Sequence, residues 1–436
     1  RVNPFIVGVT GSAGKSSAID AIAPVLRLKF KNLKVAEKAN SESGIPADIL
    51  GLHFTDYSSL DWLRICISAP FSFFLFPSSF DCYLVEMGID EPTPPKNMGY
   101  LLTILQPDIG VILNALPVHT QQFERPGLAS QGRALIKSIA TEKGKLITEN
   151  QNLKYAILNA DQPEVASLKP ANKAQVITFG KGNNSNVIIE SATSSLGGTS
   201  IAFRFQRPGP PAGGPGLIRF QNLVLPEFYG HTVASALAVA SALNINLEDA
   251  GNAISKDFKL PPGRGRIFEG IKNTTIIDSS YNASGETMLG SLKMLKNIAK
   301  NIIKIAVLGD MRELGSQAEI EHKKVAEMAI KSADKIILVG PQMKQYALPL
   351  IKQSKIPVNW FSTAGETANY LLEGSHPSDN HNQDAILQGG EIILVKGSQN
   401  TIFLEIVVEA LLKNKSDVKN LCRRGKFWDK ERRPYQ

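Results

Sequence analysis

The sequence is poor in cysteine and has no cysteine pair at short spacing. Cys66, Cys82 and Cys422 are its three cysteines, and they lie far apart in a chain of 436 residues. This spacing excludes a CxxC metal or redox motif and a disulfide framework of the secreted kind, and it is typical of a reducing cytoplasm. We therefore expect free thiols and a cytoplasmic location.

The chain also lacks an apolar run that could span a membrane. The longest, residues 65–80, contains two prolines and several serines. It falls short of the ~20 residues that a spanning helix needs. It predicts a core strand and a loop, with no stable membrane insertion. No signal peptide precedes it, and the sequence begins at Arg1 without methionine, which leaves open a missing N-terminal piece.

Excess charge is scarce outside the C-terminal end. The net charge is +8, but residues 413–436 hold nine Lys or Arg against three Asp or Glu, so the rest is nearly neutral. This distribution argues against a general nucleic-acid-binding surface and favours a small-molecule partner, although the basic tail alone could contact anionic partners weakly. We expect residues 413–436 to form a basic tail of frayed helix or disorder. The sequence does not predict an oligomeric state.

Strand-like and helical segments alternate through the first half of the chain. The apolar runs FIVGVT, CYLVEMG, DIGVILNAL, KLITE and YAILNAD are separated by helical stretches, the first of them at residues 16–30. An alanine-rich stretch predicts a further helix at residues 232–243. Such alternation predicts a mostly parallel sheet covered by helices.

The alternation restarts after the Pro-Pro-Gly cluster of residues 259–266, which predicts a hinge between domains. Five further short strands are expected at TTIIDSS, KIAVLGD, KIILVG, PVNWFS and EIILVKGS. We therefore divide the chain into residues 1–261, residues 262–412 and the tail, residues 413–436. The predicted class is α/β, with strand ends of the two domains facing a closing cleft.

A possible phosphate loop lies in VGVTGSAGKSSAIDAI, residues 7–22. A strand, a glycine-containing turn and a helix beginning at Lys15 would surround one anion with backbone N–H groups. Lys15 would neutralise terminal phosphates, and Ser16 would offer its hydroxyl to Mg²⁺. The strict pattern G-x-x-x-x-G-K-[ST] would need glycine where Val9 stands. The alternative is an ordinary glycine-rich turn with an exposed lysine.

Other polar residues follow predicted strands. Glu86 ends YLVE, where a Mg²⁺ ligand or water-positioning acid would lie, although an ordinary strand-end acid is equally compatible. Asn114 and His119 follow the next strand, and a solitary histidine is usually structural. Lys143, in IATEKGKLI, is expected from the residues alone to be a solvated lysine beside a turn.

The second half offers its own candidates. Arg264 lies at the hinge, and Asp278 ends a strand, where it could accept hydrogen bonds from ribose hydroxyls or simply cap a turn. Lys396 and Ser398 end the last strand and are expected at the same crevice.

In order along the chain, these motifs resemble the Mur ligase family. Residues 10–16 fit that family's loop, T-G-x-x-G-K-[ST], without glycine at position 9. The other matching stretches are NSESGIP, VEMG, QPDIGVILN, ILNADQP, PPGRGR, IDSSYNAS, VLGDMRELG followed by His322, and LVKGS. They are most similar to the D-alanyl-D-alanine-adding branch of peptidoglycan synthesis.

The resemblance implies a P-loop-type central ATPase domain, a C-terminal Rossmann-like α/β domain and an ATP- and Mg²⁺-dependent amide ligase. A substrate carboxylate would attack the γ-phosphate of ATP, and an amine would displace phosphate from the acyl phosphate. The expected partners are a UDP-linked muramoyl tripeptide and a dipeptide.

The resemblance also assigns site residues. It implies phosphate contacts at Thr10, Gly11, Ser12, Ala13, Gly14, Lys15, Ser16 and Ser17. It implies catalysis by Lys15, Glu86, His119 and a carbamylated Lys143. It implies metal binding by Ser16, Glu86, His119 and Lys143. It implies further nucleotide contacts at Asn114, His231, Arg264 and Asp278, and substrate contacts at Asn282, Lys396 and Ser398.

The sequence departs from the family near the expected adenine, where Thr232 and Ser235 replace two asparagines after His231. The dipeptide-adding members also carry a domain ahead of the loop, whereas nine residues precede Thr10 here. A ligase with a lipid-linked, folate-like or polymer acceptor therefore stays an alternative. So does a noncatalytic nucleotide-binding partner subunit.

Overall fold

The computed structural model describes residues 4–36, 39–55, 58–75, 80–89, 91–116, 133–206, 216–221, 223–373, 387–398 and 401–436. The chain divides into two compact units. The first comprises residues 1–191, 201–218 and 230–259, and the second comprises residues 192–200, 219–229 and 260–436. Each is described by itself below.

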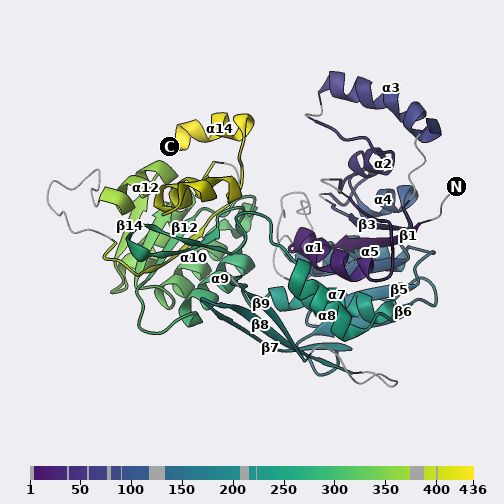
Figure 1. Cartoon of the computed structure of the whole chain (residues 1–436), viewed down its shortest axis with the longest axis horizontal. Coiled ribbons are helices and arrows are strands. Elements are labelled where there is room, and N and C mark those ends of the chain that lie inside the picture. The colour runs from purple at the N-terminus through teal and green to yellow at the C-terminus, as the bar shows by residue number, and fades with distance from the viewer. Residues whose placement is uncertain are drawn as a thin grey trace. The chain divides into compact units, whose positions relative to one another are not determined.

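A nine-stranded sheet begins in the first unit, and among the described residues its order is β2-β3-β1-β4-β5-β6-β7-β8-β9 (Figure 1). Neighbouring strands from β2 to β7 run parallel, as predicted. The strands are β1 (Phe5–Thr10), β2 (Leu33–Val35), β3 (Cys82–Glu86), β4 (Ile109–Ile112), β5 (Tyr155–Asn159), β6 (Gln175–Gly180), β7 (Val187–Ser195), β8 (Gly198–Phe205) and β9 (Leu217–Gln221). Residues of β7, β8 and β9 are shared between the two units.

Glycine is required where β8 begins. Gly198 has φ of +136°, and a Cβ there would come within 2.0 Å of the Phe220 carbonyl oxygen. The close approach of β8 to β9 therefore depends on the missing side chain.

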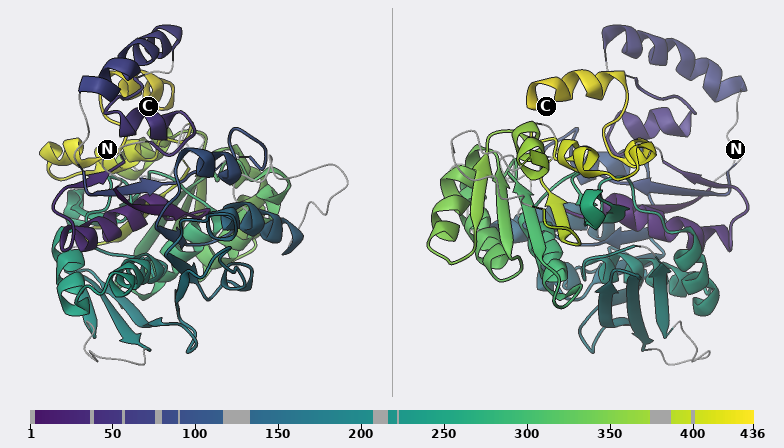
Figure 2. Two further views of the ribbon diagram at one scale, coloured as in Figure 1. Left: turned by 90° about the vertical axis from the view of Figure 1, so that its right-hand side faces the viewer. Right: turned by 60° about the vertical axis from the view of Figure 1, so that its left-hand side comes forward.

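The helices of this unit are α1 (Lys15–Arg27), α2 (Gly44–Ile49), α3 (Ser59–Leu75), α4 (Met98–Ile104), α5 (Arg133–Thr148), α6 (Pro163–Ala166), α7 (Tyr229–Ala242) and α8 (Leu247–Asp257) (Figure 2). Among them, α1, α5 and α6 contact the strands directly. Buried residues such as Tyr83 and Ile112 of the sheet pack with Leu101 of α4 and Leu146 of α5. The helices predicted at residues 16–30 and 232–243 correspond to α1 and α7.

The apolar run at residues 65–80 was expected as a core strand and loop, and this prediction is wrong for residues 65–75, whereas residues 76–79 lie outside the described residues. Residues 59–75 form α3, whose side chains Leu60, Leu63, Ile67 and Phe71 are more than half exposed. A short apolar run does not by itself distinguish a strand from a helix, because both bury apolar residues. The three- and four-residue spacing of these exposed side chains puts them on one helix face.

KLITE, residues 145–149, is also not a strand. Its first four residues end α5, and Leu146 and Ile147 are buried against the sheet. Neighbouring apolar residues at the end of an amphipathic helix gave the same local pattern as a buried strand.

The second unit contains a six-stranded sheet of order β10-β11-β15-β12-β13-β14 among the described residues. β10 pairs antiparallel with β11, and the other neighbours are parallel. The strands are β10 (Arg266–Glu269), β11 (Thr275–Ser279), β12 (Lys304–Gly309), β13 (Lys335–Val339), β14 (Val358–Phe361) and β15 (Ile392–Lys396). The five predicted strands are confirmed, and β10 is an addition.

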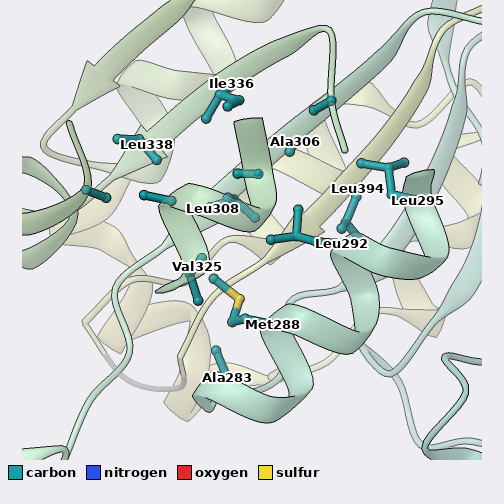
Figure 3. Packing of buried hydrophobic residues seen from close by; sticks show 14 of the residues in the cluster. Ala283, Met288, Leu292, Leu295, Ala306, Leu308, Val325, Ile336, Leu338 and Leu394 are labelled. Atoms are coloured by element: carbon teal, nitrogen blue, oxygen red, sulfur yellow. The ribbon is translucent and has the colours of Figure 1, made fainter. Parts of the chain in front are cut away.

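The helices of the second unit are α9 (Gly285–Asn297), α10 (Ala318–Ile330), α11 (Leu348–Lys352), α12 (Ala364–Glu373), α13 (Glu405–Leu411) and α14 (Lys426–Arg432) (Figure 2). Among them, α9, α11, α12 and α13 contact strands of this sheet. Met288 and Leu292 of α9 pack with Leu308 of β12 and Leu394 of β15 (Figure 3). A second apolar cluster, which includes Ile393 of β15, packs with α13. The sheet is therefore buried on both faces, as a parallel sheet requires.

Residues 413–436 are ordered, contrary to the expected frayed or disordered tail. They form a 3₁₀ segment (Lys415–Asn420) and α14, and the side chains of Arg423 and Arg432 are buried. Their guanidinium groups pair with Glu405 and Glu409 of α13. Because acidic partners on α13 neutralise them, part of this basic segment packs instead of repelling itself.

Candidate functional site

The loop between β1 and α1 has the geometry of a phosphate-binding loop. Gly14 precedes α1 with φ of +81°, a left-handed conformation in which side chains are strained. The helix starts at Lys15, and the first N–H groups of any helix lack partners inside it. Those groups and the helix dipole together favour an anion at this end.

Glu86 reaches this helix end from the neighbouring strand. β1 and β3 are parallel, and Val9 is in register with Glu86. The Ser16 hydroxyl donates a hydrogen bond to Glu86 Oε2 at 3.0 Å. Lys15 Nζ lies 3.9 Å from Glu86 Oε1 and donates to the Gly11 carbonyl at 3.0 Å. A cation, a hydroxyl and a carboxylate therefore meet at the beginning of α1.

Asn114 shapes the loop from the opposite side. Its Oδ1 accepts from the backbone N–H groups of Ser12 at 2.8 Å and Ala13 at 2.9 Å. Its Nδ2 donates to the Ala13 carbonyl at 3.0 Å. The sequence placed Asn114 among the nucleotide contacts, whereas here its amide binds the loop backbone. In this conformation the N–H groups of Ser12 and Ala13, two of the expected phosphate donors, are bonded to Asn114. The backbone N–H groups at the start of α1 are therefore the better candidates to bind a phosphate.

Side-chain hydrogen bonds of Thr10 and Ser12 also hold the loop in place. Thr10 Oγ1 is buried and donates to the Met87 carbonyl at 2.8 Å. Ser12 Oγ donates to the Leu116 carbonyl at 3.1 Å. Ser17 is buried in α1, so its side chain is part of the packing of that helix. These contacts hold the two ends of the loop independently of any ligand.

Lys143 is not solvated, contrary to the expectation from the residues alone. It lies on α5 and is 5% exposed. His119 lies outside the described residues.

These residues fit a magnesium ion in part. Mg²⁺ prefers hard oxygen ligands and is commonly held by one or two side chains together with phosphate oxygens and water. The Ser16 hydroxyl and the Glu86 carboxylate, 3.0 Å apart, are such ligands. Among the described residues, no group of three or more His, Cys, Asp or Glu side chains is placed so that it could hold a metal ion.

A second pair of polar side chains in the first unit, His231 and Asp161, is joined by a hydrogen bond. His231 lies in α7, and its Nε2 donates to Asp161 Oδ2 at 2.6 Å. The carboxylate also accepts from the backbone N–H groups of Lys181 at 2.9 Å and Gly182 at 3.2 Å. Burial opposes ionisation of Asp161, but the hydrogen bond from His231 and the backbone donors outweigh it and lower the pKa of this carboxyl.

Asp161 was missed as a site residue. It follows β5 within ILNADQP, and an acid directly after a buried strand could have indicated it. The replaced positions Thr232 and Ser235 are buried, and Ser235 Oγ donates to the Thr232 carbonyl. Their side chains belong to the packing of α7.

In the second unit, loop residues 280–282 follow β11, and Asn282 forms hydrogen bonds with residues at and just after the end of β15. Lys396 Nζ donates to the Asn282 carbonyl at 3.0 Å, and Ser398 Oγ donates to Asn282 Oδ1 at 3.2 Å. On β11, Asp278 Oδ1 accepts from the Ser280 N–H at 3.1 Å and from its hydroxyl at 2.6 Å. Three of the predicted residues, Asn282, Lys396 and Ser398, are therefore brought together.

Burial controls the charge of this cluster. Burial and the nearby positive charge of Arg264 lower the pKa of Lys396 to about 7, against the attraction of Asp278. Burial also raises the pKa of Asp278 above its ordinary value, against the hydrogen bonds from Ser280. Arg264 itself lies over the Tyr281 ring, with its guanidinium carbon 4.9 Å from the ring centroid. A buried amine that titrates near neutrality can act as a proton donor or acceptor.

No helix in the described part of the chain has both the length and the apolar character needed to cross a membrane.

Fold and site define a class, the α/β proteins in which a parallel strand leads through a phosphate-binding-type loop into a helix. A model of the Mur ligase middle domain matches residues 9–210, and one of the Mur ligase glutamate ligase domain matches residues 263–399. The chain belongs to the Mur ligase family.

Individual relatives agree with this assignment. The UDP-N-acetylmuramoyl-tripeptide–D-alanyl-D-alanine ligase of Mycobacterium leprae is 27% identical over 359 residues, which cover 77% of this chain and 61% of the relative. The chain thus aligns with less than two thirds of that relative.

Solved structures share the fold. A MurF ligase from Thermotoga maritima, in complex with ADP, has a TM-score of 0.69 at 19% identity and covers 96% of this chain and 81% of its own. A folylpolyglutamate synthase from Mycobacterium tuberculosis has a TM-score of 0.58 at 13% identity and covers 97% and 92%.

Proposed function

We propose that this chain is an ATP-dependent amide ligase that adds D-alanyl-D-alanine to a UDP-linked muramoyl tripeptide. The observation that carries the proposal is the meeting of Lys15, Ser16 and Glu86 at the first turn of α1. The relatives named D-alanyl-D-alanine ligases, which align with both halves of the chain, supply the substrate class. ATP and a nucleotide-linked acceptor would meet in the cytoplasm.

The proposed reaction forms one amide bond for each ATP. The carboxylate of the tripeptide attacks the γ-phosphorus of ATP, and ADP leaves with the electron pair of the broken P–O bond. The amine of the dipeptide then attacks the acyl phosphate and displaces inorganic phosphate, with loss of one proton. Activation replaces a poor leaving oxygen by a phosphate.

The residues of the first unit take the phosphate side. Lys15 and the first amides of α1 would bind the β- and γ-phosphates and oppose the negative charge that develops during transfer. Ser16 and Glu86 would hold one Mg²⁺, which supplies charge neutralisation to the phosphates. His119 and a carbamylated Lys143 would hold a second. Thr10, Ser12 and Asn114 maintain the loop through the hydrogen bonds described above.

His231 and Asp161 take the adenosine side in this proposal. The hydrogen bond between them fixes the imidazole, and the ionised Asp161 has acceptor capacity for a ribose hydroxyl or the base. Arg264 and Asp278 are assigned to the nucleotide as well. Asn282, Lys396 and Ser398 are assigned to the substrate, where neutral Lys396 could accept a proton from the incoming amine.

Phosphate release from ATP tests the proposal. The purified chain is given ATP and Mg²⁺ with UDP-muramoyl tripeptide, with D-alanyl-D-alanine or with both. We expect release that requires both substrates, and a product whose mass equals tripeptide plus dipeptide minus water. Release that does not require both substrates would overturn the substrate assignment. ADP binding without any release would favour a noncatalytic nucleotide-binding subunit.

A further inference from the structure

Arg423, a buried arginine of residues 413–436, contacts loop residues 280–282 of the second unit. Arg423 lies beyond residues 263–399, the range matched by the family model, and its side chain is 3% exposed. Its Nε and Nη2 donate to the Glu405 carboxylate at 2.8 and 2.6 Å. Its Nη1 donates to the Tyr281 carbonyl at 2.9 Å, and Nη2 donates to the Ser280 carbonyl at 2.8 Å. One guanidinium thus joins α13 to loop residues 280–282.

The same loop is bound from its other side by the cluster. Ser280 donates twice to Asp278, and Asn282 accepts from Lys396 and Ser398. Arg423 therefore contacts the two residues immediately before Asn282. A change in its position would be transmitted to the Asn282 carbonyl and amide through at most two peptide units.

The loop has little room to move toward its other neighbours. The Tyr281 N–H donates to the Gly263 carbonyl at 3.1 Å. A Cβ at Gly263, where φ is +77°, would lie 2.9 Å from the Tyr281 nitrogen and 3.1 Å from Cys422 Sγ. The residue before Arg423 therefore packs against the same turn. Two successive tail residues enclose the loop.

An arginine suits this place for a specific reason. The planar guanidinium can bind a carboxylate in a bidentate manner and still direct N–H groups at two carbonyls, whereas a lysine ammonium cannot reproduce that fork. Charge-assisted hydrogen bonds of this kind are strong, and a buried carbonyl left without its donor carries a desolvation cost.

We propose that Arg423 is a positioning residue that fixes loop residues 280–282 and thereby the arrangement of Asn282, Lys396 and Ser398. The inference rests on the proposed function only in assigning that cluster to the substrate. The contacts of Arg423 with Glu405 and with the carbonyls of Ser280 and Tyr281, which we call the clamp, lie wholly within the second unit.

Arg432 provides a matched control. It belongs to the same segment, its side chain is 4% exposed, and within the described residues its ion pairs are with Glu409 of α13 and Asp429 of α14. Arg423→Lys and Arg432→Lys remove the same number of guanidinium groups from the same α13 surface. Loop residues 280–282 should respond to the first replacement alone.

The test compares the full chain with both variants by amide hydrogen exchange and by steady-state kinetics. In Arg423→Lys we expect exchange in a peptide spanning residues 279–285 to accelerate about tenfold, with Arg432→Lys within about twofold of the unaltered chain. With both substrates, we expect the KM for D-alanyl-D-alanine to rise about tenfold in Arg423→Lys while kcat falls less.

The exchange measurement needs no substrate, so the two proposals fail separately. Unchanged exchange at residues 279–285 in Arg423→Lys, or equal effects of the two replacements, would overturn the clamp. If the unaltered chain lacks ligase activity while Arg423→Lys still exchanges faster at residues 279–285, the clamp is supported and the proposed function is overturned. If Arg423→Lys does not fold, Glu405→Asp keeps the charge but withdraws the carboxylate by one methylene, and the same loop response is expected.

Discussion

The Ser16 hydroxyl donates a hydrogen bond to the Glu86 carboxylate at 3.0 Å, although 70 positions separate the two residues in the sequence. Their contact follows from the parallel pairing of β1 with β3, which brings Val9 into register with Glu86. Glu86 also lies 3.9 Å from Lys15 Nζ. One carboxylate thus faces both polar side chains with which α1 begins.

Replacement of Lys15 or Glu86 by alanine should abolish most turnover. Each replacement removes a group that would oppose or organise charge on the transferring phosphoryl group, so we expect a loss of about a hundredfold or more in kcat. Lys29→Ala is the control, because Lys29 lies just beyond the other end of α1 and donates to the Leu243 carbonyl. Melting curves should show that all variants fold. Near-normal turnover of Lys15→Ala or Glu86→Ala would remove that residue from the phosphate site.

Lys143→Ala should lose activity that short carboxylates partly restore. If Lys143 is carbamylated, its side chain ends in a carboxylate-like anion, and formate or acetate at millimolar-range concentrations can take that place. Lys145→Ala is matched, because Lys145 lies on the same helix and pairs with Glu142 at 2.8 Å. Phosphate release with and without the additives is the measurement. Full activity of Lys143→Ala without additive would contradict the assignment.

Asn114→Ala should weaken nucleotide binding although Asn114 contributes no charge. The replacement removes an acceptor from the N–H groups of Ser12 and Ala13 and frees the loop to adopt other conformations. We expect the Kd for ADP to rise about tenfold, the effect of losing one to two kcal/mol of preorganisation. Calorimetric titration measures it, and Asn172→Ala, at a surface turn, is the control. An unchanged Kd would show that the loop keeps its shape without Asn114.

Lys396 should give the second unit a stability that rises with pH. Burial, together with Arg264, lowers the pKa of Lys396 to about 7 from its ordinary value of 10.5. Above pH 7 the unfolded chain therefore binds one proton more than the folded chain. The free energy of unfolding then increases with pH, at a slope that approaches about 1.4 kcal/mol per pH unit.

The measurement is the thermal midpoint of the second unit between about pH 7 and 8.5, compared at each pH with that of Lys396→Met. The Cys422 thiol begins to ionise in the unfolded chain within this window, and its contribution cancels in the comparison. Lys396→Met should flatten the dependence and unfold at a higher temperature near pH 7. A parallel pH dependence in the variant would mean that Lys396 is charged in the folded protein.

The sequence was most informative where local pattern and chemistry coincide. The loop before Lys15 could be predicted because strand, glycine turn and helix follow one another without interruption. Glu86 could be predicted because an acid that ends a buried strand of a parallel sheet lies at the edge where the neighbouring loops gather. Both predictions need only neighbouring residues and the rule for parallel sheets.

Prediction failed where a partner distant in sequence decides the outcome. Arg423 was taken as part of a disordered basic tail, because nothing near it reveals that Glu405 and two loop carbonyls would bind it. Lys143 looked solvated because its local sequence is polar, whereas the helix that carries it turns this position inward. The run at residues 65–80 had the composition of a core segment, and composition does not specify whether it forms a strand or a helix.

The chain between β2 and β3, which we call the excursion, can change in length without moving Glu86. Between these strands the described residues form α2 and α3, and β3 still pairs with both β2 and β1. Register is set by the strands, so the length of the excursion does not determine where Glu86 arrives. The excursion is therefore a place at which the number of residues can change while Glu86 keeps its position beside Ser16.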